Sequence, residues 1–343
     1  MRMPRIKAPL SHPKAHYHIV SRVVDRRQVL HAEEKEHFIS LMRKYETFCD
    51  VRVLSFCILS NHFHILVQVL PPPKILPSIE ELIQRVEDLG VLNAATKLRK
   101  QLALFTELDD QASIELLRKS LLDRMWDISV FIKELKQRFS FWFNKKHQRK
   151  GTLWEERFRS VLVEGAGHAL ASMAAYIDLN PVRARIVCDP KDYRWSSYSE
   201  AMASRSKAME GLRHVIAGLK RVDLESITVT TSLADYRLWM YSKGEQRDGV
   251  DVQGRPSRLG IQRDVVSKMV RNKGRVSVED YVTMRVRYLV DGKIVGGRDF
   301  VEGIFQSLRH RFGKNRKTGA RRMRGVESEE LYCIRDLKLR LFD

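Results

Sequence analysis

Two histidines separated by one residue are the first feature of this chain that could do chemistry. His62 and His64 lie in the run Asn61-His62-Phe63-His64, with apolar, β-rich segments on both sides. Side chains of a strand alternate between its two faces, so we expect both imidazoles on one face and Phe63 in the core. Two neighbouring imidazoles can bind one divalent metal ion, although such a pair is more often only polar surface.

A tyrosine and an asparagine four residues apart are the second such feature. The spacing puts Tyr176 and Asn180 on one helix face. Pro181 disfavours helical geometry at Asn180, so we expect its amide in the last helical turn or just beyond it. That amide oxygen could join the two imidazoles around a metal ion, which would then polarise a phosphate ester. A phenol titrates at about pH 10, so a neighbouring cation could make Tyr176 nucleophilic; taken alone, such a tyrosine is usually a half-buried aromatic.

The overall charge indicates the kind of partner. The chain has 343 residues, with 62 Lys and Arg against 42 Asp and Glu and a net charge of +20. This excess favours a polyanionic partner, and nucleic acid before a membrane surface. No uninterrupted apolar stretch could span a membrane and the N-terminus lacks a signal-peptide core, so we expect a cytoplasmic protein associated with the nucleoid through DNA. The four cysteines show no C-x-x-C spacing, which argues against disulfides and a zinc knuckle.

The elements that must hold these residues follow an α+β pattern. The opening 70 residues read as strand, helix, strand and strand, with hairpin pairing of the last two. Three prolines at 71–73 end this segment, and the chain is then helical in pieces to about residue 143. The predicted strands cover 16–24, 51–59, 62–69 and a stretch after Gly151, and the predicted helices include 33–48 and 168–179.

A basic region with interleaved aromatics ends the long helical part. Seven Lys or Arg lie between residues 133 and 150, among Phe139, Phe141, Trp142 and Phe143. Most charge runs are only solvated helix faces. Because aromatics stack on bases while cations bind phosphates, we interpret this one as a nucleic-acid contact.

The chain changes character beyond about residue 205. Polar, linker-like stretches precede three predicted helices, near 262–271, 278–289 and 299–312. Eight Lys or Arg and no acidic residue lie between Arg309 and Arg324, as a flexible tail or, the reading we favour, a phosphate-binding arm. We therefore predict a catalytic domain over 1–200, with a helical insertion at about 71–126, and a basic, mainly helical extension over 201–343.

Four sequence stretches resemble one known family. Residues 61–67 resemble the HUH motif of the single-tyrosine transposases, in which U is a bulky apolar residue. Residues 151–160, 176–184 and 192–198 resemble signature stretches of one branch, the REP-associated tyrosine transposases, which act on repetitive extragenic palindromes. The motifs occur in the expected order, and the resemblance runs from about residue 15 to 200.

The resemblance implies a fold, a site and a reaction. It implies a small antiparallel sheet flanked by helices, of the ferredoxin-like HUH-endonuclease type. It implies Mg²⁺ or Mn²⁺ bound by His62, His64 and Asn180, where many relatives carry a glutamine instead of Asn180. It also implies Tyr176 as the nucleophile on single-stranded or hairpin DNA, leaving a 5′-phosphotyrosine and a free 3′-OH. We expect a monomer, as is common in this branch.

Three hypotheses remain from the sequence. The first is this metal-dependent strand transferase, and the second is a domesticated, non-catalytic protein that binds hairpin DNA. A zinc hydrolase is weaker, because no H-E-x-x-H pattern accompanies the histidines. The cations that we predict to contact DNA are Arg22, Lys145, Lys146, Arg149, Lys150, Arg157, Arg159, Arg183, Lys314, Arg316, Lys317, Arg321 and Arg322.

Overall fold

The structure, a computed structural model, describes residues 6–8, 14–91, 93–187, 190–203, 205–228, 236, 294–313, 315–322 and 331–334. The strands are β1 (Ala15–Arg22), β2 (Val51–Ile58), β3 (His62–Val69), β4 (Arg159–Val163), β5 (Ile294–Gly296), β6 (Arg321–Arg322) and β7 (Tyr332–Cys333). The helices are α1 (Ala32–Phe48), α2 (Ile79–Asp88), α3 (Ala94–Glu107), α4 (Gln111–Leu122), α5 (Ile128–Lys146), α6 (His168–Asp178), α7 (Asn180–Arg183), α8 (Ser197–Met202), α9 (Ser206–Lys220) and α14 (Arg298–Ser307). None of these helices is long and apolar enough to cross a membrane.

The strands form one seven-stranded sheet in the order β2-β3-β1-β4-β5-β7-β6. β2 and β3 form the expected hairpin, and β1 pairs antiparallel with both β3 and β4. The predicted α+β class, with helices flanking the sheet, is confirmed. The sheet is larger than expected and one pair is parallel, because β5, from the C-terminal part, runs parallel to β4. A parallel pair needs a long crossover, and the segment between these two strands is long enough to supply one.

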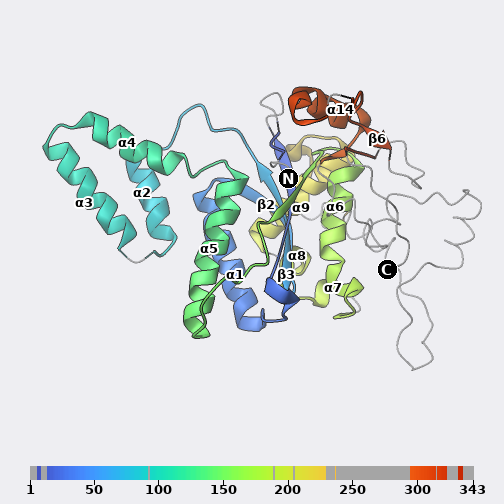
Figure 1. The fold of residues 1–343 in the computed structure, drawn as a ribbon, viewed down its shortest axis with the longest axis horizontal. Coiled ribbons are helices and arrows are strands. Elements are labelled where there is room, and N and C mark those ends of the chain that lie inside the picture. The colour runs from blue at the N-terminus through green and yellow to red at the C-terminus, as the bar shows by residue number, and fades with distance from the viewer. Residues whose placement is uncertain are drawn as a thin grey trace, which may run out of the picture.

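Helices cover both faces of this sheet (Figure 1). Phe63, Ile65 and Val67 of β3 point into a core shared with α1 and α5. Leu66, on the alternate face, packs in a second core with α6, α8 and α9. Phe63 is fully buried, as its position between two histidines predicted. The histidines of β3 therefore face α6 and not α5.

Helix α9 lies directly on β2. A Cβ atom added at Gly211 would come within 2.6 Å of the Leu54 carbonyl oxygen, so only glycine allows this approach. α9 thus shares the core of the sheet although it follows residue 200. The division into a catalytic domain and an extension stays a prediction.

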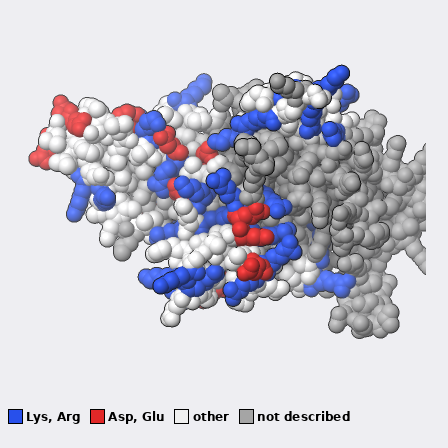
Figure 2. All heavy atoms as spheres, viewed as in Figure 1, with Lys and Arg blue, Asp and Glu red and all other residues white. Residues whose placement is uncertain are grey.

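Helices α2, α3 and α4 form a module that projects from the body of the protein (Figure 1). The Ser78 hydroxyl caps α2 by accepting a hydrogen bond from the Glu81 amide, and the Glu81 carboxylate accepts one from the Ser78 amide. Residues 71–126 carry eight Lys or Arg against nine Asp or Glu. Figure 2 shows acidic side chains at the outer end of the module. Glu107 and Asp109 are exposed where α3 ends, just before α4. The positive charge of the chain therefore lies elsewhere.

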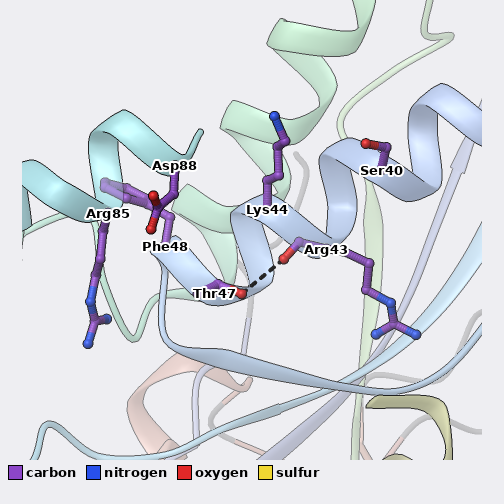
Figure 3. A pocket seen from close by; sticks show the side chains of 7 residues that line it. All are labelled: Ser40, Arg43, Lys44, Thr47, Phe48, Arg85 and Asp88. Carbon is purple, nitrogen blue, oxygen red and sulfur yellow. Dashed lines mark hydrogen bonds between the residues drawn. The ribbon is translucent and has the colours of Figure 1, made fainter. Parts of the chain in front are cut away.

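A hollow of about 330 Å³ lies between α1 and α2 (Figure 3). Its lining residues are Ser40, Arg43, Lys44, Thr47, Phe48, Arg85 and Asp88. The Thr47 hydroxyl donates to the Arg43 carbonyl, and the Arg43 guanidinium is paired with Glu46 and Glu200. Because α1 covers the opposite sheet face from α6, this hollow is separate from the histidines.

The basic C-terminal segment is folded where it is described, so this part is not a flexible tail, while the phosphate-binding arm stays a prediction. Helix α14 corresponds to the predicted helix near 299–312, whereas 262–271 and 278–289 lie outside the described residues. The Arg316 guanidinium lies 5.4 Å from the ring centre of Phe305 and 5.2 Å from that of Phe312. It also donates to the carbonyls of Thr318 and Gly319. Cation–π contacts and main-chain hydrogen bonds thus hold Arg316 inside this segment.

Candidate active site

The start of β3 places His62 and His64 side by side on the sheet face that α6 covers. Their ring centres are 5.0 Å apart. His62 is partly exposed and His64 is buried. The His62 Nδ1 lies 2.6 Å from the Asn61 side-chain oxygen, which favours a proton on Nδ1. The His62 Nε2 then carries the lone pair that a metal ion would use.

A third histidine, His18 of β1, completes this cluster. Its Nε2 lies 3.0 Å from the His64 Nδ1, and the two rings stack with centres 5.2 Å apart and planes within 10°. His18 is fully buried. Sequence reasoning assigned 16–24 to a strand but gave His18 no role. A sequence signal for His18 was present, because His16-Tyr17-His18 has the same alternation of histidine and aromatic residue as His62-Phe63-His64.

The surroundings keep His64 neutral. Burial lowers the pKa of His64 well below its usual value, and the neighbouring His62, His18, Arg22 and Arg183 lower it further. A neutral imidazole has a lone pair to offer, so this environment favours the metal-binding form.

Tyr176 reaches the same cluster from α6. Its ring centre lies 5.6 Å from that of His64 and 5.9 Å from that of His18, with the ring planes nearly perpendicular. The Arg183 guanidinium lies 4.6 Å from the centre of the Tyr176 ring, and its Nη1 donates to the Tyr176 carbonyl at 3.0 Å. The fold thus brings together residues that are more than 100 positions apart in the chain.

Asn180 lies just past the end of α6, as Pro181 predicted. α6 ends at Asp178, and the short α7 begins at Asn180. The Asn180 side-chain nitrogen donates to the Tyr176 carbonyl at 2.9 Å. Its amide oxygen is therefore directed away from that carbonyl.

The chemistry of these donors decides whether a metal ion fits. Two imidazoles and an amide oxygen would form an incomplete ligand set, which leaves positions for phosphate oxygens and water. Within the ranges that the structure describes, no three His, Cys, Asp or Glu side chains gather so as to hold a metal ion. The residues fit a cation that the protein shares with its substrate, and do not fit a closed structural site.

The comparison with known families bears on this arrangement. Residues 11–90 match the family model Y1_Tnp, described as IS200-like transposases, and this stretch includes His18 and both histidines of β3. This region is therefore similar to the IS200-like transposases. The resemblance to single-tyrosine transposases, expected from the motifs, is confirmed.

Two solved structures are similar to this chain. One is a REP-associated tyrosine transposase bound to a REP hairpin, with 13% identity and a TM-score of 0.36 over 59% of this chain and 83% of that one. The other is a putative transposase from Deinococcus radiodurans R1, with 14% identity and a TM-score of 0.23 over 54% of this chain and 92% of that one. No curated protein matches.

A buried carboxylate anchors the helix that carries Tyr176. One Asp178 side-chain oxygen accepts hydrogen bonds from Ser197 at 2.8 Å and from Ser55 at 3.4 Å. The other accepts from the Tyr236 hydroxyl at 2.6 Å. Burial raises the pKa of Asp178 to about 6, against the opposing effect of these hydrogen bonds. Asp178 thus links α6 to β2 and α8, two residues from Tyr176.

Replacing Asp178 with alanine should destabilise the protein by about 3 kcal/mol, because three buried hydroxyls lose their acceptor. Urea denaturation followed by circular dichroism measures this loss. Asp123→Ala is the control, since Asp123 is exposed and paired only with the exposed Lys119; its effect should stay within about 0.5 kcal/mol. Equal stability of the two variants would show that the Asp178 hydrogen bonds contribute nothing.

Three of the predicted DNA-contacting arginines lie near the histidines. Arg22 is the direct cross-strand neighbour of His62. Arg22, Arg157 and Arg159 line one small hollow. Arg159 also lies 3.1 Å from a Glu156 carboxylate oxygen. The contact of these arginines with DNA stays a prediction.

The predicted cations at the end of α5 differ in what they touch. Lys146 bonds to two carboxylates at the start of α1, at 2.6 and 2.7 Å. Arg149 donates to a main-chain carbonyl. Lys145 and Lys150 are exposed. Their exposure makes these two the better candidates for phosphate contacts.

The predicted cations of the C-terminal segment can be placed only in part. Lys314 lies outside the described residues, and only the main chain of Arg322 is described. Lys317 and Arg321 are exposed, whereas Arg316 packs within the segment as described above. Their contact with DNA remains a prediction.

Proposed function

We propose that this transposase is a metal-dependent, single-strand DNA strand transferase that cleaves through a 5′-phosphotyrosine. The observation that supports this most is the approach of the Tyr176 ring to His64 and His18 on the face that also carries His62. A nucleophile, two metal-binding side chains and a cation, Arg183, meet there from separate elements.

The reaction is an exchange of one phosphodiester for another. The Tyr176 Oη attacks the scissile phosphorus and forms a P–O bond, while the bond from phosphorus to the 3′ oxygen breaks. The phenol proton leaves to solvent and the departing 3′ oxygen takes up a proton. Because the phosphotyrosine conserves the energy of the broken bond, a later 3′-OH can reverse the step and rejoin DNA.

Each neighbouring residue has a distinct part in this scheme. His62, His64 and Asn180 would hold Mg²⁺ or Mn²⁺, which supplies Lewis-acid polarisation of the phosphate when bound. Asn61 and His18 orient the two imidazoles through their other ring nitrogens. In the proposal Arg183, over the Tyr176 ring, and Arg22, beside His62, attract the phosphate and favour the phenolate.

We propose hairpin DNA with single-stranded flanks as the substrate and a monomer as the acting form. The motif likeness to REP-associated transposases supports the hairpin, and the charge of +20 supports a nucleic-acid substrate. The likeness and charge also support our expectation of a cytoplasmic protein bound to the nucleoid.

A labelled hairpin incubated with the protein, with and without Mn²⁺, tests the proposal. We expect a denaturation-resistant protein–DNA adduct only with the metal ion. The adduct should retain the fragment 3′ of the cut, and the other fragment should end in a 3′-OH that a polymerase can extend. Complete absence of an adduct, or release of both fragments with no covalent stage, would refute the mechanism.

The second candidate function is a hairpin-binding protein without catalysis. The observation that favours it is that, among the residues described, no three His, Cys, Asp or Glu side chains are arranged so as to hold a metal ion. The same assay separates the candidates, since this one predicts a shifted complex on a native gel and no adduct with either Mg²⁺ or Mn²⁺.

A further inference from the structure

The four aromatics near the end of α5 have different environments in the fold. Phe139 and Phe143 are buried in the core. Trp142 stacks on His37 with ring centres 3.8 Å apart, and the Lys146 amine lies 5.1 Å from the Trp142 ring centre. Phe141 alone of the four is strongly exposed, at 67%. All four are candidate stacking residues by their sequence position, and Phe141 is the one whose ring the structure leaves open to a ligand.

Phe141 lies within an exposed polar and basic row of α5. Lys133, Gln137, Phe141 and Lys145 follow one another at four-residue spacing, and all four are exposed. Successive members are roughly 6 Å apart along the helix axis. Arg138, partly exposed, lies one turn before Phe141. An exposed phenyl ring between cations matches the two needs of a single strand, a surface for a base and charges for its phosphates.

This row ends near the candidate active site. The α5 residue Lys146 bonds to Glu34 in the first turn of α1. The Leu30 amide, just before α1, donates to the carbonyl of Ser60, which immediately precedes Asn61 and His62. The C-terminal end of α5 is therefore linked, through the start of α1, to the turn that leads into the histidine strand. Figure 2 shows Lys and Arg gathered at this lower end of α5.

We propose that Phe141 is a stacking platform for an unpaired base of the DNA strand that leaves the Tyr176 site, with Lys145 and Lys133 binding phosphates on either side. This inference rests on the proposed function, because it needs a single strand in the site. It adds a binding surface on the opposite side of the sheet from α6. The apolar exposure of Phe141 is then accounted for by its ligand.

Binding of two oligonucleotides tests the platform. Oligothymidylate and an abasic oligonucleotide of equal length present the same phosphates, and only the first presents bases. We expect Phe141→Ala to weaken oligothymidylate binding about tenfold and to leave abasic binding unchanged. Phe141→Trp should retain wild-type affinity for both. Lys145→Gln should weaken both and lower the salt slope by somewhat less than one.

Leu104→Ala is the matched control, because Leu104 is 50% exposed on α3 in the module without net positive charge. It should bind both oligonucleotides like the wild type. Equal binding by Phe141→Ala and wild type, or an equal loss on both oligonucleotides, would overturn the platform. A changed oligomeric state with unchanged DNA binding would assign Phe141 to contact with a second copy, which also overturns it.

The adduct assay distinguishes this inference from the proposed function. If the wild type forms the Mn²⁺-dependent adduct while Phe141→Ala binds oligothymidylate normally, only the platform is wrong. If oligothymidylate binding depends on Phe141 but no adduct forms, the stacking platform is supported and the strand-transfer chemistry is refuted. If the wild type binds no single-stranded DNA, both the stacking platform and the proposed function are refuted.

Discussion

Replacing Tyr176 with phenylalanine should abolish the covalent protein–DNA adduct, with a fall of at least roughly 10³-fold in cleavage. The substitution removes the oxygen that would attack phosphorus and keeps the ring that packs beside His64 and His18. DNA affinity should stay within about twofold, since the phosphate-binding cations are untouched. A denaturing gel measures the adduct, and fluorescence anisotropy measures the affinity.

Tyr45→Phe provides the matched control for this change. Tyr45 is also buried, but on α1, which covers the other face of the sheet. Its variant should form wild-type amounts of adduct. An adduct that persists in Tyr176→Phe would assign the nucleophile to another residue and remove the main support for the proposed mechanism.

Replacing His62 with alanine should lower Mn²⁺ affinity by at least about 10²-fold and remove the metal-dependent adduct. His62 would supply one of only two imidazoles, so its loss leaves a cation with a single nitrogen ligand and an amide. Because His62 is partly exposed, the fold should survive, whereas a substitution at the buried His64 would also leave a cavity. Isothermal titration with Mn²⁺ measures the affinity directly and needs no activity.

Two further variants sharpen this experiment. His18→Ala should give a smaller loss, about 10- to 100-fold, because His18 would act by orienting His64. His310→Ala, at an exposed histidine of the C-terminal segment, should bind Mn²⁺ like the wild type. Unchanged Mn²⁺ affinity in His62→Ala would exclude the two histidines as a metal site and favour the non-catalytic alternative.

Local periodicity was enough to predict several parts of the site. Alternation along a strand places the side chains of His62 and His64 on one face whatever packs around them. Four-residue spacing places Tyr176 beside Asn180, and the proline after Asn180 predicts the end of the helix there. These predictions needed no knowledge of distant residues, since each depends on backbone geometry over a few positions.

Pairings between distant segments could not be predicted in this way. The contact of His18 with His64 depends on the register of β1 against β3, which sequence spacing does not encode. The parallel pairing of β4 with β5 joins segments separated by more than 100 residues. The carboxylate of Asp178 likewise finds hydroxyls from three separate parts of the chain.

The sequence by itself determined the strand and helix order of the first 70 residues, the face shared by the two histidines and the excess of positive charge. Only the tertiary structure decided that the Tyr176 ring meets those histidines, and that Phe141 is exposed while Phe139 and Phe143 are buried. The reason is that burial and approach depend on which surfaces pack together. α1 and the sheet cover one side of α5 and leave the other side to solvent.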